Sequence, residues 1–256
     1  MKKILCLIIM SLLLLTACTK KEKENTLDKI INRNLIIAGV KQDAGPFGHI
    51  NEKGQYDGFD IDVAKYIANK LTGSEKNIKF VPVTSNTRIE AVTSGEVDMI
   101  IATMSNTESR RYIIDFSIPY YTAGQTAVVK NKSKIYSFAD LKDKTTIVVM
   151  GSTSEQNLRR VIPTARIVGY STYKEAFQAL KDGKGDALSS DDTIISGFIA
   201  KNKGFRVLKG RISAEHYSIG IKQTDDKLLK ETLDSIITGM KNNGTLKELK
   251  KKWSLV

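Results

Sequence analysis

An alternation of strand-like and helix-like segments, present once in each half, is the feature that most constrains the fold of this 256-residue chain. In the first half, apolar runs typical of buried strands alternate with amphipathic segments typical of helices, at residues 34–40, 59–71, 79–83, 86–95 and 98–103. The same alternation returns between residues 144 and 191, with strand-like runs at 144–150 and 166–168 and helix-like runs at 153–161 and 173–181. Because short connections between alternating elements favour a parallel sheet covered by helices, the sequence predicts an α/β protein.

The two halves also match each other in detail. Residues 90–98 and 177–186 each contain a helix end, a glycine turn and an acidic residue before the next strand. We therefore expect two lobes whose strand ends face a shared cleft. The apolar stretches 127–130 and 218–222 are the expected connections between them. The predicted first lobe comprises residues 34–127 and 219–256, and the predicted second lobe comprises 128–218.

The N-terminal region has the pattern of an export signal. A basic start is followed by an apolar run from Ile4 to Leu15, which is too short for a comfortable membrane span. Leu15-Thr16-Ala17-Cys18 resembles the bacterial lipobox, which implies that residues 1–17 are removed and that Cys18 is lipidated. We expect residues 18–33 to form a polar tether and lead-in, with the lipid on Cys18 holding the protein to the outer face of the cell membrane.

Charge and composition argue against several classes of function. Forty basic and 28 acidic residues give a net charge of +12. The lysines are scattered and are not interleaved with aromatic residues along one face, so we do not expect nucleic acid as a partner. Two histidines and no second cysteine in the mature chain argue against a zinc or thiol site, and we expect no cofactor and no metal.

The segment that follows the third predicted strand is a candidate binding site. The apolar run 99–102 ends in the polar residues 103–109, and Arg110 and Arg111 follow. Strand ends of open α/β sheets deliver ligand-binding groups, and either arginine could grip a carboxylate through two parallel hydrogen bonds. The alternative is a solvated turn with two surface arginines.

The second half offers complementary groups. Gly151 to Gln156 opens a helix whose free N–H groups could hold a carboxylate, although Thr153 and Gln156 are also spaced as a capping box. Asp191 ends a predicted strand and could bind an ammonium group or cap the next helix. Arg88 stands early in its helix, an unfavourable position for a cation, so it is either functional or simply solvated.

Six segments together resemble the polar amino acid binding proteins of bacterial ABC importers, namely residues 58–64, 98–103, 107–111, 115–121, 186–191 and 244–253. The resemblance covers nearly all of the chain after the signal. It implies the type II periplasmic-binding-protein fold, in which two α/β lobes are joined by two connecting strands and enclose a ligand cleft. It also implies hinge closure on a bound amino acid.

The resemblance implies roles for individual residues. Arg110, helped by Ser105, would clamp the α-carboxylate of the ligand. Thr153 and Ser154 at a helix start would contribute to the same end. The backbone carbonyl of Thr103 would receive the α-ammonium group, and Asp191 from the second lobe would supply the countercharge. These assignments choose Arg110 over Arg111, and a zwitterion does need such opposite partners when it is buried.

The side-chain end of the ligand is indicated by two further segments. Residues 41–43, which include Lys41, and residues 86–88, which include Arg88, look like the branch that binds glutamate, aspartate or glutamine. Two extra cations favour an acidic side chain, and Met150 stands where glutamine-binding relatives often have a lysine. Phe47 is expected to wall the cleft, whereas the neighbouring aromatics Tyr120 and Tyr121 belong either to the cleft or to the core.

The prediction is therefore a monomeric, lipid-anchored and outward-facing receptor. It would capture a free acidic or amide amino acid and pass it to the permease subunits of an ABC importer. Catalysis is not expected, because neither histidine is spaced with an acid or a nucleophile. Two alternatives use the same scaffold: a dehydratase, and a sensory or adhesive surface protein.

Overall fold

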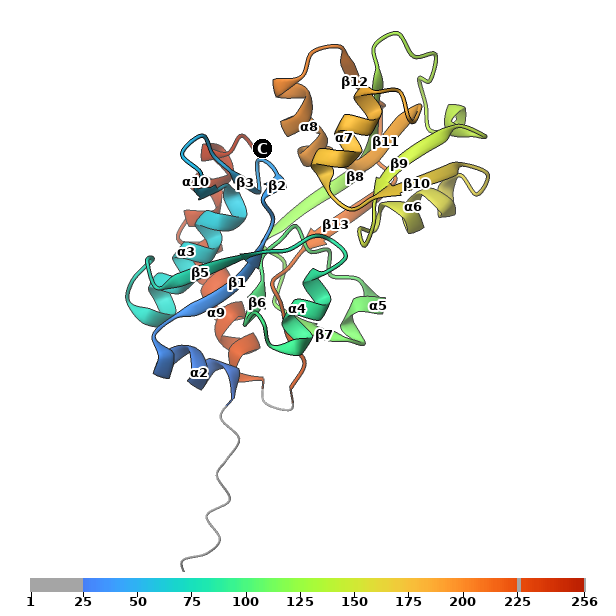
Figure 1. Ribbon diagram of the computed structural model, residues 1–256. Helices are drawn as coiled ribbons and strands as arrows, with labels where there is room; N and C mark the ends of the chain where they lie inside the picture. The colour runs from blue at the N-terminus through green and yellow to red at the C-terminus, as the bar shows by residue number, and fades with distance from the viewer. Residues whose placement is uncertain (1–24, 225–226, 256) are drawn as a thin grey trace, which may run out of the picture.

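The computed structural model describes residues 25–224 and 227–255. The predicted signal, the proposed lipidation site Cys18 and residues 18–24 of the predicted tether and lead-in lie outside the described residues. The rest of that predicted tether is not extended, because residues 26–33 form a helix with Ile30 buried. The described chain forms two lobes, each built on its own sheet (Figure 1). In the described residues no helix is both long and apolar enough to cross a membrane.

The first lobe contains a five-stranded sheet in the order β5-β1-β6-β14-β7. Its strands are β1 (Ile36–Val40), β5 (Ile78–Pro82), β6 (Met99–Ile100), β7 (Ile114–Phe116) and β14 (Gly220–Lys222). Its helices are α2 (Thr26–Arg33), α3 (Phe59–Thr72), α4 (Arg88–Ser94), the short α5 (Glu108–Arg111), α9 (Leu228–Asn242) and α10 (Thr245–Lys252). A small sheet of β2 (Asp43–Ala44), β3 (Gly48–Ile50) and β4 (Tyr56–Asp57) lies beside it.

The second lobe contains a sheet in the order β10-β9-β11-β8-β12, and β13 also pairs with β8. Its strands are β8 (Tyr121–Lys130), β9 (Thr145–Val149), β10 (Arg166–Tyr170), β11 (Ala187–Asp191), β12 (Phe205–Val207) and β13 (Ser213–Tyr217). Its helices are α6 (Ser154–Val161), α7 (Tyr173–Lys181), α8 (Asp192–Lys201) and the 3-10 turn η2 (Ala139–Leu141).

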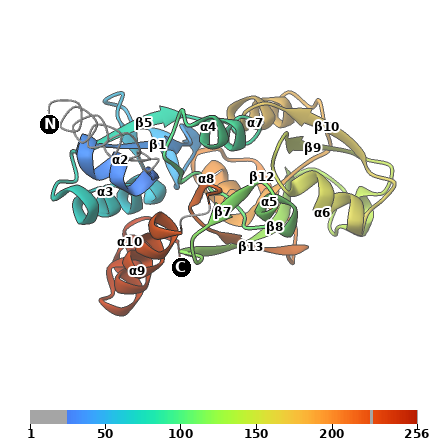
Figure 2. The same cartoon turned by 90° about the horizontal axis from the view of Figure 1, so that it is seen from below.

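Each lobe repeats the expected parallel unit. In the first lobe β1 pairs in parallel with β5 and β6, and in the second lobe β9 pairs in parallel with β10 and β11. The predicted type II arrangement of two α/β lobes is thus confirmed. The chain returns to the first lobe after β13: β14 pairs with β6 and β7, and α9 packs beside α2, α3 and α10 (Figure 2).

The chain passes between the lobes twice, at residues 117–120 between β7 and β8 and at residues 218–219 between β13 and β14. On the second-lobe side of these connections, β8 and β13 run antiparallel as neighbours (Figure 1). The predicted lobe boundary after residue 127 falls inside β8, whose residues 121–130 form one continuous strand. Residues 121–125 pair with β13, and residues 125–128 pair with β11.

The third parallel strand of the first lobe is shorter than its apolar run predicts. Ladder pairing includes Met99 and Ile100, and the Ile101 N–H still donates to the Gly39 carbonyl over 2.9 Å. The strand then ends because Thr103 adopts a left-handed conformation with φ of 48°. That turn frees the carbonyl groups of Ala102 and Thr103, and both accept hydrogen bonds from Arg88 instead.

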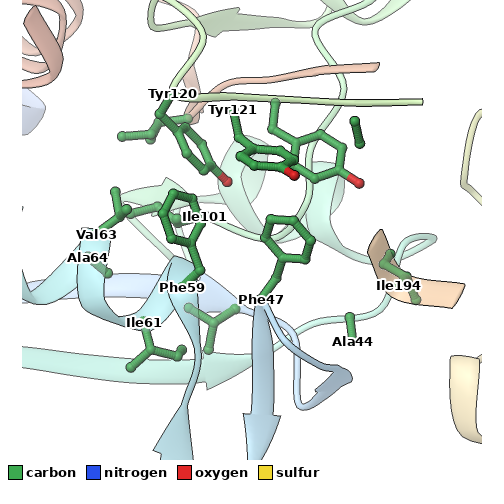
Figure 3. Packing of buried hydrophobic residues seen from close by; sticks show 14 of the residues in the cluster. Ala44, Phe47, Phe59, Ile61, Val63, Ala64, Ile101, Tyr120, Tyr121 and Ile194 are labelled. Carbon is green, nitrogen blue, oxygen red and sulfur yellow. The ribbon is translucent and has the colours of Figure 1, made fainter. Parts of the chain in front are cut away.

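An aromatic cluster lies where the lobes meet. Phe47 packs edge-on against Phe59, Tyr121 and Tyr217, with ring centroids 5.9, 5.2 and 5.3 Å away. Figure 3 shows the rings of Phe47, Phe59, Tyr120 and Tyr121 converging. Phe47 lies in the turn between β2 and β3, Phe59 begins α3, and Tyr121 begins β8, so burial of these aromatic surfaces links the lobes at their junction.

Gly58 fixes the entry of α3 into this cluster. Its φ of 135° is accessible to glycine, and a Cβ there would overlap the carbonyl oxygen of Phe47. Just after Gly58, the N–H groups of Phe59 and Asp60 donate to the carbonyls of Pro46 and Phe47, each over 2.9 Å. The start of α3 is therefore bonded directly to the loop that carries Phe47.

We expect Gly58→Ala to lower the free energy of unfolding by at least about 2 kcal/mol, because backbone strain and overlap add at one position. Gly54→Ala is the matched control: Gly54 has φ of 73° but no atom near an added Cβ, so only the conformational cost of about 1 kcal/mol applies. Urea denaturation followed by circular dichroism measures both. Equal losses would show that the contact with Phe47 is unimportant.

Candidate functional site

Arg88 is a deeply buried cation of the candidate site. It is the first residue of α4, it is 2% exposed, and its guanidinium contacts the residues that follow β6. Its Nη1 donates to the carbonyls of Ala102 and Thr103 over 2.6 and 3.1 Å, and its Nη2 reaches the Gly151 carbonyl of the second lobe at 3.4 Å. The Nε atom is buried and has no hydrogen-bond partner among the described residues. A solvated Arg88 is therefore excluded.

Arg110 and Arg111 have different environments. Arg110 is 8% exposed, and it donates to the carbonyls of Ser105 and Gly151, both over 2.9 Å. Arg111 is exposed, and its Nε donates to the Asn106 side chain over 2.7 Å. Burial and then the charge of Arg88 lower the pKa of Arg110 to about 9. Of the pair, Arg110 is the cation that faces the lobe interface.

Lys41 is a third buried cation, at the end of β1. It is 1% exposed, and its Nζ donates to the Ser85 hydroxyl over 2.7 Å. The same Nζ lies 5.4 Å from the ring centroid of Tyr173 in the second lobe. Burial, and next the charge of Arg88, lower the pKa of Lys41 well below its usual value. An added anion beside Lys41 would relieve this electrostatic cost.

Asp191 supplies negative charge from the second lobe. It is 5% exposed at the end of β11, and one carboxylate oxygen accepts from the Tyr217 hydroxyl. The other oxygen, Oδ1, is buried without a partner among the described residues. Burial and then Glu215 raise the pKa of Asp191 to about 7. Its side chain does not cap α8, so the capping alternative is excluded.

Thr153 and Ser154 lie at the start of α6, as predicted, and the alternative of a capping box with Gln156 is excluded. The Thr153 hydroxyl makes no capping bond. It donates to Glu215 over 2.8 Å and accepts from Gln125 over 2.7 Å. The buried carboxylate of Glu215 competes successfully for that hydroxyl, because hydrogen bonds to ionised groups are stronger. The backbone N–H of Ser154 approaches the Ser152 hydroxyl at 3.3 Å.

The remaining predicted residues lie in the same region with existing partners. The Thr103 carbonyl accepts from Arg88, and the Thr103 N–H donates to Asp60 over 2.9 Å. Ser105 is 4% exposed, and its carbonyl accepts from Arg110. Phe47 is fully buried in the aromatic cluster. The structure thus brings all nine predicted ligand-binding positions to the lobe interface, and their contacts with a ligand stay predictions.

Two buried residues of β13 that the sequence analysis did not identify belong to the same region. Tyr217 bonds Asp191, and Glu215 accepts from Thr153, Asn157 and Ser213 over 2.8, 2.8 and 2.6 Å. Alternation along this strand buries residues 215 and 217. A carboxylate on the inward face of such a strand was the available signal, because charged residues are rarely buried without partners.

The geometry suits a small molecule with charges of both signs. Arg88, Arg110 and Lys41 approach from the first lobe, and Asp191 faces them from the second. Arg88 Nε and Asp191 Oδ1 are unsatisfied in the described structure. Buried donors and acceptors of this kind are costly unless paired, so a ligand that carries an anion and a cation would complete both sides.

Comparison with known proteins agrees with this geometry. The ABC transporter glutamine-binding protein GlnH of Bacillus subtilis (strain 168) is 41% identical over 267 residues, covering 99% of this chain and 97% of GlnH. A glutamine-binding protein of Geobacillus stearothermophilus is 46% identical over 198 residues, covering 77% of this chain and 76% of that protein.

Solved structures are also similar over most of the chain. The cysteine-binding protein from Campylobacter jejuni has a TM-score of 0.85 at 33% identity, covering 90% of this chain and 92% of that one. Residues 36–256 match the family model described as bacterial extracellular solute-binding proteins, family 3. The family expected from the sequence motifs is thus confirmed, and this chain belongs to the family 3 bacterial extracellular solute-binding proteins.

Proposed function

We propose that this solute-binding protein is a receptor that captures glutamine, glutamate or aspartate and delivers it to the permease of an ABC importer. The observation that carries the proposal is the pair of unsatisfied buried groups on opposite lobes, Arg88 Nε and Asp191 Oδ1. The names of the two glutamine-binding relatives support an amino acid ligand. A chemical step is not part of the proposal, because those relatives are named as binding proteins.

The α-amino acid end of the ligand has matched partners. In the proposal, Arg110 binds the α-carboxylate, and Ser105 and the helix start at Thr153 and Ser154 add to that end. Asp191 binds the α-ammonium group together with the Thr103 carbonyl. The guanidinium of Arg110 has N–H groups beyond the two that bond main-chain carbonyls, which supports its role as the clamp. The buried Thr153 hydroxyl already serves Glu215, so its contribution would come from the backbone.

The side-chain end of the ligand faces Lys41 and Arg88 in this proposal. Both are nearly fully buried, and burial of two cations within one region favours a ligand that brings negative charge or strong acceptors. A carboxylate satisfies both requirements, and an amide oxygen satisfies the second. The buried cations therefore favour glutamate or aspartate, while the names of the relatives favour glutamine. Phe47 would form the aromatic wall.

The cellular setting is the remaining part of the proposal. Cleavage before Cys18 and lipidation of that cysteine would hold a monomer on the outer face of the cell membrane, through the predicted tether that precedes α2. Lobe 1 would comprise residues 26 to about 120 and about 218 to 255, because α2 packs on α3 and α9, β8 lies wholly in the second sheet and β14 lies wholly in the first. The lobes would then close on the ligand like a hinge.

Isothermal titration with free L-amino acids tests the proposal. We expect the protein, unfolded and refolded to remove bound ligand, to bind L-glutamine, L-glutamate or L-aspartate and to leave each unaltered. Arg110→Ala should weaken that binding by at least about a hundredfold, because it removes a buried charge-assisted clamp. Arg111→Ala is the matched control and should bind normally, since Arg111 is exposed. Preferential binding of L-arginine, or an equal loss in both variants, would contradict the proposal.

Binding of L-glutamine should depend on pH through Asp191. Its pKa of about 7 in the ligand-free protein should fall when a ligand ammonium group arrives, so binding favours the ionised form. Affinity should be fully developed above pH 7 and fall below it, by up to about tenfold per pH unit. Titrations between pH 5.5 and 8 measure this. Asp191→Asn should bind weakly with a flat profile, and an unchanged slope in that variant would assign the proton to another group.

Lys41→Met should separate acidic from amide ligands. The substitution keeps length and apolar contact but removes the charge, so affinity for L-glutamate should fall about tenfold more than affinity for L-glutamine. Lys53→Met, which removes an exposed lysine, should change neither affinity. Equal losses for the two ligands in Lys41→Met would show that Lys41 does not contact the ligand side chain.

A further inference from the structure

Asp43 connects the two lobes through a helix terminus. It lies on β2 in the first lobe, and its Oδ2 accepts the N–H of Tyr173 over 2.7 Å and approaches the N–H of Lys174 at 3.4 Å. Both N–H groups belong to the first turn of α7 in the second lobe. One carboxylate of the first lobe thus sits on the positive end of a helix in the second lobe, an electrostatically favourable position.

The first turn of α7 is otherwise capped from within its own lobe. Thr172 and Glu175 form a capping box, in which the Thr172 hydroxyl accepts the Glu175 N–H and the Glu175 carboxylate accepts the Thr172 N–H, each over 3.1 Å. Tyr173 and Lys174 carry the two N–H groups of this turn that the box does not satisfy. The acceptor that the helix itself lacks is therefore supplied across the lobe interface.

Close backbone contacts accompany this bond. A Cβ on Gly197 of α8 would overlap the carbonyl oxygen of Gly45, two residues after Asp43. A Cβ on Gly151 would lie 2.6 Å from the backbone of Ser85 and of Asn86. Glycine at positions 151 and 197 permits the two lobes to touch backbone to backbone beside the Asp43 contact.

The bond also places a wall of the proposed ligand pocket. Tyr173, whose N–H Asp43 accepts, is 3% exposed, and its ring lies over the Lys41 amine. Asp43 and Lys41 are two residues apart in the first lobe. The hydrogen bond between Asp43 and α7 therefore holds the Tyr173 ring over Lys41, where the side chain of the proposed ligand would lie.

We propose that Asp43 is a positioning residue that holds the lobes closed and thereby slows ligand release. This inference rests on the proposed function, since it concerns the same cleft. Asp43 acts through α7 and Tyr173 and touches no ligand itself. In an open protein the Asp43 carboxylate and both N–H groups are hydrated, so the hydrogen bond stabilises the closed state only.

Exchange of radiolabelled L-glutamine or L-glutamate, whichever binds the unmodified protein, tests this inference. Asp43→Ala should dissociate about tenfold faster, with a much smaller change in the association rate, because a charge-assisted bond of the closed state is lost. Asp43→Asn keeps a hydrogen-bond acceptor but loses the charge, so its dissociation rate should lie between those of the unmodified protein and Asp43→Ala. Small-angle X-ray scattering at saturating ligand should show a larger radius of gyration for Asp43→Ala than for the unmodified protein.

Asp140→Ala is the matched control. Asp140 accepts two backbone N–H groups, from Tyr136 and Ser137, each over 2.9 Å, but all three residues belong to one surface turn of the second lobe. The rate at which ligand dissociates from Asp140→Ala should therefore equal that of the unmodified protein. An unchanged rate in Asp43→Ala, or equal acceleration in Asp140→Ala, would overturn the inference. Failure of the unmodified protein to bind glutamine, glutamate and aspartate would instead overturn the proposed function.

Discussion

Burial of like charges at the lobe interface is the constraint on which the site depends. Arg88, Arg110 and Lys41 lie within one region and are each less than a tenth exposed. Such charges are tolerated only when hydrogen bonds and opposite charges compensate them. The carbonyls of Ala102, Thr103, Ser105 and Gly151 supply the first kind of compensation, and Asp191 and Glu215 supply the second. The carbonyls of Ala102 and Thr103 are free to do so because the third parallel strand stops after residue 100.

The same constraint links binding to closure. Gly151 belongs to the second lobe, yet its carbonyl accepts from both Arg88 and Arg110 of the first. Asp43 makes the reciprocal contact, from a first-lobe carboxylate to second-lobe N–H groups. The lobes are therefore joined by polar contacts that flank the buried charges. A ligand that satisfies Arg88 Nε and Asp191 Oδ1 would add to contacts already made by the closed protein.

Much of the architecture could be predicted because its signals are local. The amphipathic and apolar runs at residues 59–71 and 144–150 predicted α3 and β9 to within about two residues, the usual margin for element ends. The later helix at 173–181 was predicted with the observed bounds. The capping-box alternative at Thr153 could be excluded only from the structure, because the hydroxyl donates to a distant carboxylate, that of Glu215.

The sequence by itself determined the family, the two-lobed α/β class and the candidate ligand-binding positions, because periodicity and motif spacing are properties of neighbouring residues. It left Arg110 and Arg111 equivalent on chemistry, and it left Arg88 either solvated or functional. Tertiary structure separated these alternatives by burying Arg88 and Arg110 and exposing Arg111. It also decided the partnership of Asp43 with Tyr173, 130 residues away. Contacts between distant segments depend on how the two lobes pack, and no local pattern encodes that packing.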